Sequence, residues 1–301
     1  METTNAFITK RPSKIFQIPG WLASGKSVLK AKLAEATDID ASSLPYHEEL
    51  LAWLRNQKAE GRTLVLATAS HHTVADKVAT HLDLFDEVLA TEGDLNLKSH
   101  AKRELLVSRY SEGGFDYIGN DRADLPVWQA SNIAHIVSSS APFINQIKSE
   151  SNVDQVFAAG NAPFLRTLIK AMRPHQWMKN LLIFVPLLTS QHYGDVQSIL
   201  LTLLAFLVFG LTASSVYLLN DLVDVADDRH HPRKRSRPFA SGSLSLLTGW
   251  LAWPALVLGA FTLGILFLPL PFVGALATYF MLTLAYSMSL KDTLKNSAFD
   301  R

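Results

Sequence analysis

The sequence contains no cysteine, which excludes disulfide bonds, thiolate nucleophiles and cysteine-ligated metals. It also lacks an excess of either charge, because 28 Lys and Arg residues balance 27 Asp and Glu residues to a net charge of +1. This balance gives no electrostatic reason for a nucleic-acid partner, and we expect none. The amino-terminal residues lack the apolar run of a signal peptide, so we expect no secretory signal.

Charged residues are also missing from two long stretches, 196–220 and 239–290. A membrane span needs about 20 apolar residues. The first stretch therefore fits one helix, and the second fits two helices broken near Pro269 and Pro271. A shorter apolar segment, Asn180–Thr189, is predicted to form the first span, reaching back to Trp177. The sequence thus predicts an all-α transmembrane bundle of about four spans in the carboxyl-terminal half.

Basic residues cluster before the first predicted span, between the second and third, and after the fourth. With four spans, all three clusters lie on the same side of the membrane, and the positive-inside rule makes that side cytoplasmic. We therefore expect an integral protein of the inner or plasma membrane, with both ends in the cytoplasm. The clusters are Arg166, Lys170, Arg173 and Lys179; Arg229, Arg233, Lys234, Arg235 and Arg237; and Lys291, Lys295 and Arg301.

The amino-terminal half alternates short apolar runs with helical patterns. Regular alternation of this kind predicts a Rossmann-like α/β domain with a parallel sheet, whose functional loops follow the carboxyl ends of the strands. Residues 1–140 are assigned to this soluble domain, 141–163 to a linker, and 164–301 to the membrane domain. The predicted strands are 64–68, 87–90, 117–119 and 134–137, and the predicted helices are 47–56, 73–82, 99–109 and 124–131.

The second predicted span ends in the sequence NDLVDVADD, residues 220–228, which we call the acidic motif. Asp221, Asp224 and Asp228 are spaced to share one helix face, whereas Asp227 falls off that face and is expected to be solvated. Clustered carboxylates need a cation, and oxygen ligands suit Mg²⁺, which often bridges carboxylates to substrate phosphates. A basic run follows the acidic motif, and its side chains could bind phosphate oxygens. The alternatives are therefore a metal–phosphate site and a solvated loop that only sets topology. The helical phasing of the aspartates, the adjacent basic run and the position at the end of a span favour the site.

The acidic motif and the sequence HPRKRSRPFASG that follows it resemble the first Asp-rich motif of the UbiA superfamily of membrane prenyltransferases. The sequence RPHQWMKN, residues 173–180, resembles the start of the first helix in a subgroup that includes decaprenyl-phosphate phosphoribosyltransferases. The resemblance implies a prenyl or polyprenyl phosphate or diphosphate as substrate, an acceptor, and a lipid bilayer. It also implies Mg²⁺-diphosphate coordination by Asn220, Asp221, Asp224 and Asp228, and phosphate contacts from Lys179, Lys234, Arg235 and Arg237.

The chain departs from this family in one respect. The family has more membrane helices and a second Asp-rich motif, whereas this sequence ends after about four predicted spans. Asp292 and Asp300 lie near the end without the pattern of the second motif. Two interpretations follow: a fragment without part of the substrate cavity, or a chain that works with a partner.

The soluble half carries polar residues after successive predicted strands. Together these residues resemble motifs of the haloacid-dehalogenase-like phosphatases, which implies that Thr68 binds phosphate, Lys98 steadies it, and Asp121 and Asp124 hold a metal. That family needs a nucleophilic aspartate, in the pattern DxDx[TV], at the end of its first strand. The DxD at residues 38–40 follows no apolar strand, so we interpret both acids as loop residues. The domain is expected to be an incomplete or inactive phosphatase-like domain.

The sequence therefore leaves four functions open. The first is a UbiA-type transferase that moves a prenyl group, an alkyl group other than methyl. The second is transfer of a phosphoribosyl group to a polyprenyl phosphate, which the RPHQWMKN sequence favours. The third is a membrane-anchored phosphatase, which the missing nucleophile disfavours. The fourth is a non-catalytic membrane fragment.

Overall fold

The computed structural model describes residues 1–92, 97–160, 163–191 and 194–287. The chain divides into two compact units, Met1–Asn161 and Ala162–Arg301. The third basic cluster, with Lys291, Lys295 and Arg301, lies outside the described residues, as do Asp292 and Asp300.

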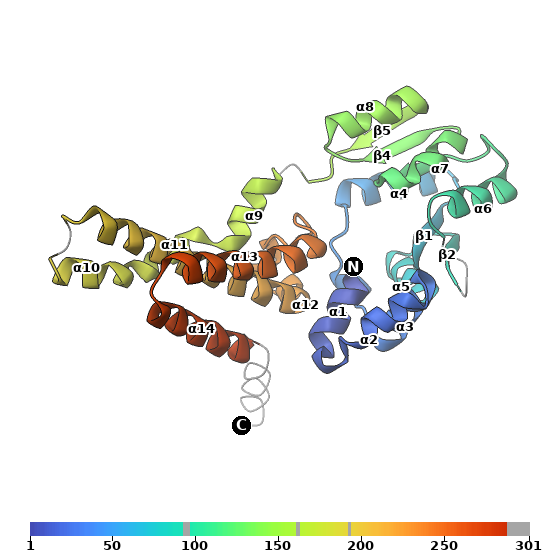
Figure 1. The fold of residues 1–301 in the computed structure, drawn as a ribbon. Helices are drawn as coiled ribbons and strands as arrows, with labels where there is room; N and C mark the ends of the chain where they lie inside the picture. Colours follow the sequence, from blue (N-terminus) through green and yellow to red (C-terminus); the bar gives the residue numbers. More distant parts are fainter. Residues whose placement is uncertain (93–96, 161–162, 192–193, 288–301) are drawn as a thin grey trace. The chain divides into compact units, whose positions relative to one another are not determined.

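The first unit contains two small parallel sheets connected by helices (Figure 1). The strands β1 (Val65–His71) and β2 (Glu87–Thr91) form one sheet, and β3 (Tyr117–Gly119), β4 (Ala134–Val137) and β5 (Val153–Phe157) form the other. The four predicted strands are confirmed, because each lies within a residue or a few residues of its expected position. The connecting helices are α4 (Glu48–Ala59), α5 (His72–Leu82), α6 (His100–Tyr110), α7 (Leu125–Ala130) and α8 (Ala141–Glu150), with the short η3 (Arg122–Asp124) before α7.

One continuous Rossmann-like sheet is not found. In the described residues β1 pairs only with β2, and β3 pairs only with β4, so the strands that would meet in the middle of a single sheet do not pair with each other. The sheet topology therefore confirms parallel strands but leaves the Rossmann-like arrangement unconfirmed.

Most of the predicted linker, residues 141–163, is folded, which corrects the sequence analysis. It forms α8 and β5, and β5 pairs in parallel with β4 through Ala134 and Val153. Pro142 was interpreted as a loop signal, but it occupies the first turn of α8, where a missing N–H costs nothing. Phe143 and Ile147 lie four residues apart on this helix and are buried in the core.

The core of the first unit lies around Trp128, which is 1% exposed. Its indole Nε1 donates a hydrogen bond to the carbonyl of His135 at 3.2 Å, which joins α7 to β4. Leu97, Val127, Ile136 and Ile147 are fully buried in the same cluster.

Helices precede the first strand, and no strand is described before residue 65. They are α1 (Glu2–Lys10), η1 (Pro12–Lys14), α2 (Gln17–Ala23), α3 (Lys26–Ala36) and η2 (Ala41–Ser43). Asp38 lies in the loop after α3 and pairs with Lys77, and Asp40 caps η2 by accepting from the backbone N–H of Ser42 at 2.9 Å. Both acids are therefore loop residues, as expected.

The second unit is helical. It contains α9 (Phe164–Met172), η4 (Pro174–Phe184), α10 (Val185–Thr189), α11 (Val196–Val223), α12 (Val225–His230), η5 (Lys234–Ser236), α13 (Leu246–Phe267) and α14 (Leu270–Ala285). Figure 1 shows α11 and α13 side by side, and these two helices pack on each other. The break between α13 and α14 confirms the position predicted near Pro269.

Two of these helices, α11 with 28 residues and α13 with 22, are long and apolar enough to cross a membrane. On α13, Leu251, Leu258 and Ile265 are exposed, which suits contact with lipid rather than water. The other two predicted spans are shorter: α14 has 16 residues, and the predicted first span is the 3₁₀ helix η4 followed by α10. The structure therefore supports two candidate spans and does not confirm four.

Close packing fixes η4 against α11. A Cβ added at Gly210 would lie 2.6 Å from the indole of Trp177, so only glycine leaves room for that ring. Trp177 Nε1 donates to Ser214 Oγ at 2.9 Å, and Ser214 Oγ donates to the carbonyl of Met172 at 2.8 Å. These bonds hold the turn between α9 and η4 beside the middle of α11.

Candidate functional site

The acidic motif lies at the carboxyl end of α11 and is nearly helical throughout. Asp221 is in the last turn of α11, Asp224 ends that helix, and Asp228 is on α12. The backbone N–H of Asp228 still donates to the carbonyl of Asp224 at 2.8 Å, which preserves helical spacing across the junction. Asp221 and Asp228 are 3% and 1% exposed, so the motif buries two of its carboxylates.

Arg237 brings these two carboxylates together. Its Nη1 donates to Oδ1 of Asp221 at 3.2 Å and to Oδ2 of Asp228 at 2.7 Å. Lys234 Nζ lies 3.8 Å from Oδ1 of Asp228. Two buried carboxylates would repel each other in a medium of low dielectric constant, and a shared guanidinium offsets that repulsion.

Arg173 also binds the acidic motif, although its sequence context predicted only a basic residue that sets topology. It donates through Nη2 to Oδ1 of Asp221, and its guanidinium carbon lies 5.3 Å from the ring centroid of Tyr217. Arg173 follows α9 in a left-handed conformation, with φ of 54°. This conformation turns the chain where η4 begins. The sequence signal that could have indicated this contact is the position of Arg173 at the start of the RPHQWMKN sequence.

Two oxygens in this cluster have no hydrogen-bond partner among the described residues: Oδ2 of Asp221 and Oδ1 of Asp228. A buried carboxylate oxygen without a donor is costly, so it indicates a missing cation or donor. Oxygen-only ligands suit Mg²⁺, which is commonly held by one or two carboxylates while substrate phosphates supply other ligands. The residues therefore fit a magnesium ion shared with a phosphate.

A site made by three carboxylates is not assembled in the described part of the chain, where no group of three or more His, Cys, Asp or Glu residues is placed to hold a metal ion. Asp224 is half-buried at the junction of α11 and α12, and Asn220 is half-buried one turn before it. Asp227 is exposed, as expected. Lys179 and Arg235 are exposed and are not among the residues that contact Asp221 or Asp228.

The polar residues predicted in the soluble half do not form a comparable cluster. Lys98 and Asp121 are exposed, and Asp121 caps η3 by accepting from the backbone N–H of Ala123 at 2.9 Å. Thr68 Oγ1 accepts from the backbone N–H of Ser70 at 3.1 Å. Within the residues described, neither Asp121 nor Asp124 belongs to a group of three or more His, Cys, Asp or Glu residues placed to hold a metal ion.

Asp124 is the buried member of that set, and its carboxylate is already engaged. Oδ1 accepts from Lys102 Nζ at 3.0 Å and from the Tyr117 hydroxyl at 2.9 Å, while Oδ2 faces the backbone N–H groups of Asn120 and Asp121. Burial raises the pKa of the Tyr117 phenol, and the Asp124 carboxylate raises it further. These contacts favour a structural role for Asp124 in joining α6 to β3.

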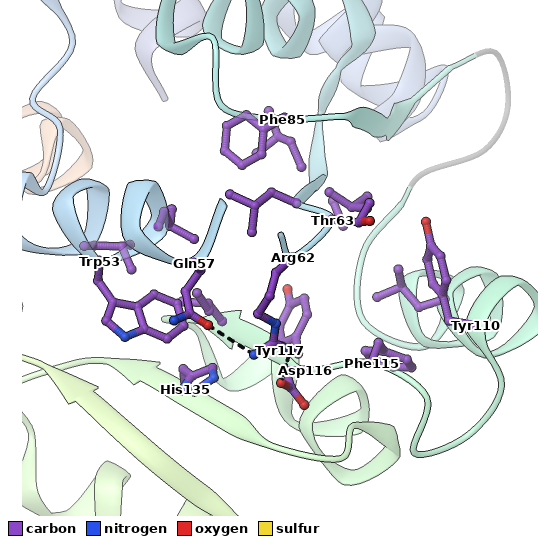
Figure 2. A pocket seen from close by; sticks show the side chains of 18 of the residues that line it. Trp53, Gln57, Arg62, Thr63, Phe85, Tyr110, Phe115, Asp116, Tyr117 and His135 are labelled. Atoms are coloured by element: carbon purple, nitrogen blue, oxygen red, sulfur yellow. Dashed lines mark hydrogen bonds and ion pairs between the residues drawn. The ribbon is translucent and has the colours of Figure 1, made fainter. Parts of the chain in front are cut away.

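The first unit also contains a cavity of about 470 Å³ that the sequence did not predict. Figure 2 shows Trp53, Arg62, Asp116, Tyr117 and His135 around it. The cavity lies between α4 and the amino-terminal parts of β1 and β3. It is therefore bordered by both sheets.

Comparison with known proteins finds a family match within the second unit. Residues 181–296 match the model of the UbiA prenyltransferase family. That family is integral to membranes, in agreement with the two long apolar helices. The haloacid-dehalogenase-like assignment of the first unit finds no confirmation.

Three relatives illustrate the similarity. The uncharacterized protein y4nM of Sinorhizobium fredii is 36% identical over 288 residues, which cover 95% of this chain and 55% of that protein. Nodulation protein NoeC of Azorhizobium caulinodans is 51% identical over 100 residues, covering 33% of this chain and 31% of NoeC. Decaprenyl-phosphate phosphoribosyltransferase of Mycobacterium tuberculosis is 39% identical over 130 residues, covering 41% of this chain and 42% of that enzyme.

The aligned parts thus span about half or less of each of these relatives.

Proposed function

We propose that the second unit binds the phosphate groups of a polyprenyl-phosphate transferase reaction, with Mg²⁺ held at the acidic motif. The observation that carries this proposal is the buried pair Asp221 and Asp228, each with one oxygen lacking a hydrogen-bond partner, inside the region that matches the UbiA family. A solvated loop that only sets topology would not bury two carboxylates and link them through one arginine.

Each residue of the cluster has a separate task in this proposal. Asp221 and Asp228 hold the metal through their unpartnered oxygens. Lys234 and Arg237, which already lie beside the carboxylates, contact phosphate oxygens. When bound, Mg²⁺ supplies positive charge that stabilises the departing diphosphate. Arg173 keeps Asp221 oriented, because its guanidinium is fixed between that carboxylate and the ring of Tyr217.

Within this class, we favour transfer of a phosphoribosyl group from its diphosphate donor to a polyprenyl phosphate. The support is the similarity over 130 residues to a decaprenyl-phosphate phosphoribosyltransferase, together with the RPHQWMKN sequence. Transfer of a prenyl group from a prenyl diphosphate is the alternative, because the same carboxylates and cations suit either diphosphate. A phosphatase is disfavoured, since Asp124 is engaged by Lys102 and Tyr117.

Calorimetry on the full chain in detergent tests the proposal through binding, which does not require the complete reaction. Phosphoribosyl diphosphate should bind in the presence of Mg²⁺ and not in the presence of a chelator. Tighter binding of a prenyl diphosphate would select the alternative transfer. If neither diphosphate binds, or if binding is indifferent to Mg²⁺, the proposed site is wrong.

A further inference from the structure

The short helix α9 has an apolar face that the described part of the chain leaves uncovered. Phe164, Leu165 and Ile169 on this helix are 60%, 64% and 46% exposed. Leu165 and Ile169 lie four positions apart and therefore share one side of the helix, and Phe164 adjoins them at its start. Large apolar side chains gathered in one exposed patch mark a surface that binds a partner or a membrane. We call these three residues the apolar face of α9.

The opposite side of α9 is the one that packs against the protein. Thr167 and Ala171, also four positions apart, are 4% and 1% exposed. In a helix of about 3.6 residues per turn they lie almost opposite the apolar face. Ala171 belongs to the same buried cluster as Leu218 and Leu222 of α11, and the two helices pack on each other. Helix α9 is thus held on the carboxyl-terminal part of α11 without using its apolar face.

Two basic residues lie along the edge of the apolar face. Arg166 and Lys170 directly follow Leu165 and Ile169 in the sequence, and both are exposed. Among the described residues neither basic side chain forms an ion pair or a hydrogen bond, and α9 itself contains no acidic residue. An apolar face with an uncompensated positive edge complements a surface that is apolar in its interior and negatively charged at its rim. The headgroup region of a bilayer with anionic lipids has this arrangement.

Helix α9 is placed to lie along a membrane surface rather than to cross the membrane. Its nine residues extend about 14 Å, less than half of a hydrocarbon core of about 30 Å. Figure 1 shows α9 running across the direction of α11 rather than alongside it. It packs near the end of α11 that carries the acidic motif, and charged residues of this kind are costly inside the hydrocarbon core. With α11 across the membrane, α9 therefore lies at the level of the headgroups.

We propose that α9 docks on the surface of a membrane that contains anionic lipids. Phe164, Leu165 and Ile169 enter the boundary between headgroups and acyl chains. Arg166 and Lys170 extend their long side chains to the lipid phosphates, because their alkyl stems can lie along the apolar boundary while the charged ends stay in the polar layer. The proposal is independent of the function proposed for the acidic motif.

A second copy of the chain is the competing occupant of the apolar face. A symmetric dimer would bring the same patch of both copies together, so Arg166 and Lys170 of each copy would face like charges. Burial in such an interface would also remove the water that weakens this repulsion. Anionic lipid phosphates instead supply the opposite charge to both residues, and we therefore favour the membrane.

Fluorescence quenching on the full chain in lipid nanodiscs tests this inference. The chain lacks cysteine, so Ile169→Cys carries a single fluorescent label. The quencher is a nitroxide on the acyl chain of phosphatidylglycerol, which is anionic, or of phosphatidylcholine, which has no net charge. Both lipids should quench the label, and competition between them should show about fivefold preference for phosphatidylglycerol, the scale for one basic residue at an anionic surface. Leu258→Cys, exposed on α13, is the reference and should be quenched by both lipids alike.

A charge-removing variant separates the apolar face from its basic edge. Arg166→Gln combined with Lys170→Gln should reduce the lipid preference at Ile169→Cys to about one, while quenching itself persists. Lys14→Gln combined with Lys148→Gln removes the same two charges at exposed positions of the first unit and should leave the preference unchanged.

Three results would overturn the inference. Absence of quenching at Ile169→Cys, with Leu258→Cys quenched, would show that protein covers the apolar face. Equal quenching by the two lipids would remove the anionic surface as the partner. A preference that survives the loss of Arg166 and Lys170 would assign it to other residues.

Discussion

Asp221 and Asp228 are seven positions apart and share one guanidinium nitrogen, because Arg237 Nη1 lies 3.2 Å from the first carboxylate and 2.7 Å from the second. This arrangement places two buried acids of one motif within reach of a single cation. It also means that the acidic motif and the basic run after it form one cluster rather than two independent surfaces.

The first prediction concerns the metal-dependent affinity for diphosphate. Asp221→Asn and Asp228→Asn should each weaken Mg²⁺-dependent binding by about 2–4 kcal/mol, the scale for losing one preorganised charge contact. Asp227→Asn is the matched control, since Asp227 is exposed in the same motif, and it should have a much smaller effect. Calorimetry in detergent measures all three variants. Equally small losses of affinity in all three variants would show that the buried aspartates do not differ from Asp227, and the proposed site would be wrong.

The second prediction concerns stability without metal. Arg237→Ala leaves two buried carboxylates without their shared partner, so it should destabilise the second unit by about 3 kcal/mol in the presence of a chelator. Mg²⁺ should restore part of that loss, because a cation that binds only the folded state stabilises it. Arg235→Ala, an exposed neighbour, should be close to neutral. Thermal unfolding in detergent would contradict the prediction if both variants lost the same stability.

The third prediction concerns packing between η4 and α11. Gly210→Ala would force a methyl group against the Trp177 ring and should cost about 1–3 kcal/mol, as overpacking does in well-filled cores. Gly259→Ala on α13 is the control, because a Cβ there meets nothing within 4 Å. Unfolding midpoints in detergent compare the two. A loss at Gly259 as large as that at Gly210 would show that the Trp177 contact is not the cause.

The fourth prediction concerns pH and His135. Burial lowers the pKa of this imidazole, and Arg62 adds to that effect, while Asp154 and Asp116 oppose it. A lowered pKa favours the neutral form in the folded state. The unfolded chain then binds more protons, so stability is full above the ordinary histidine pKa of about 6.5 and falls as the pH drops through it.

His135→Gln should flatten this pH dependence between about pH 7 and pH 5, whatever it does to the absolute stability. His100→Gln, at an exposed position on α6, should leave the slope unchanged. Trp53 is a suitable reporter, because its ring centroid lies 4.9 Å from that of His135. An unchanged slope in His135→Gln would assign the pH dependence to another group.

The fifth prediction concerns orientation in the membrane. The chain lacks cysteine, so a single introduced cysteine reports one position without background. Ala226→Cys lies beside the second basic cluster and should be shielded from a membrane-impermeant maleimide in intact cells, whereas Gly194→Cys at the other end of α11 should react. The opposite labelling pattern would reverse the proposed cytoplasmic side.

Local sequence patterns predicted the strands because short apolar runs bounded by polar residues are limited to a few conformations. They could not predict that β1 and β3 would remain apart, since strand pairing depends on segments distant in sequence. The linker interpretation was wrong because Pro142 and Gly160 were weighed as breakers, while the buried pair Phe143 and Ile147 was not counted. Composition is a weak guide where a few core contacts decide the structure.

Prediction of the candidate site from the sequence was limited in the same way, because some of its contacts join residues that are distant in sequence. Helical spacing correctly placed Asp227 outside and predicted that Asp221 and Asp228 would share a side. Arg173 was missed as a site residue because it lies 48 positions from Asp221, and its contact depends on the left-handed turn after α9. Lys179 and Arg235 were included by resemblance alone, and neither contacts the buried pair.

The ion pairs of the two buried carboxylates have a consequence for the order of ligand arrival. Arg173, Lys234 and Arg237 together place three positive charges against the two negative charges of Asp221 and Asp228. A bare divalent cation must compete with these three cations for the two carboxylates, whereas a cation that already carries an anionic diphosphate brings negative charge that the three cations can bind. The cluster should therefore select the preformed metal–diphosphate complex, and raising free Mg²⁺ alone should saturate it poorly.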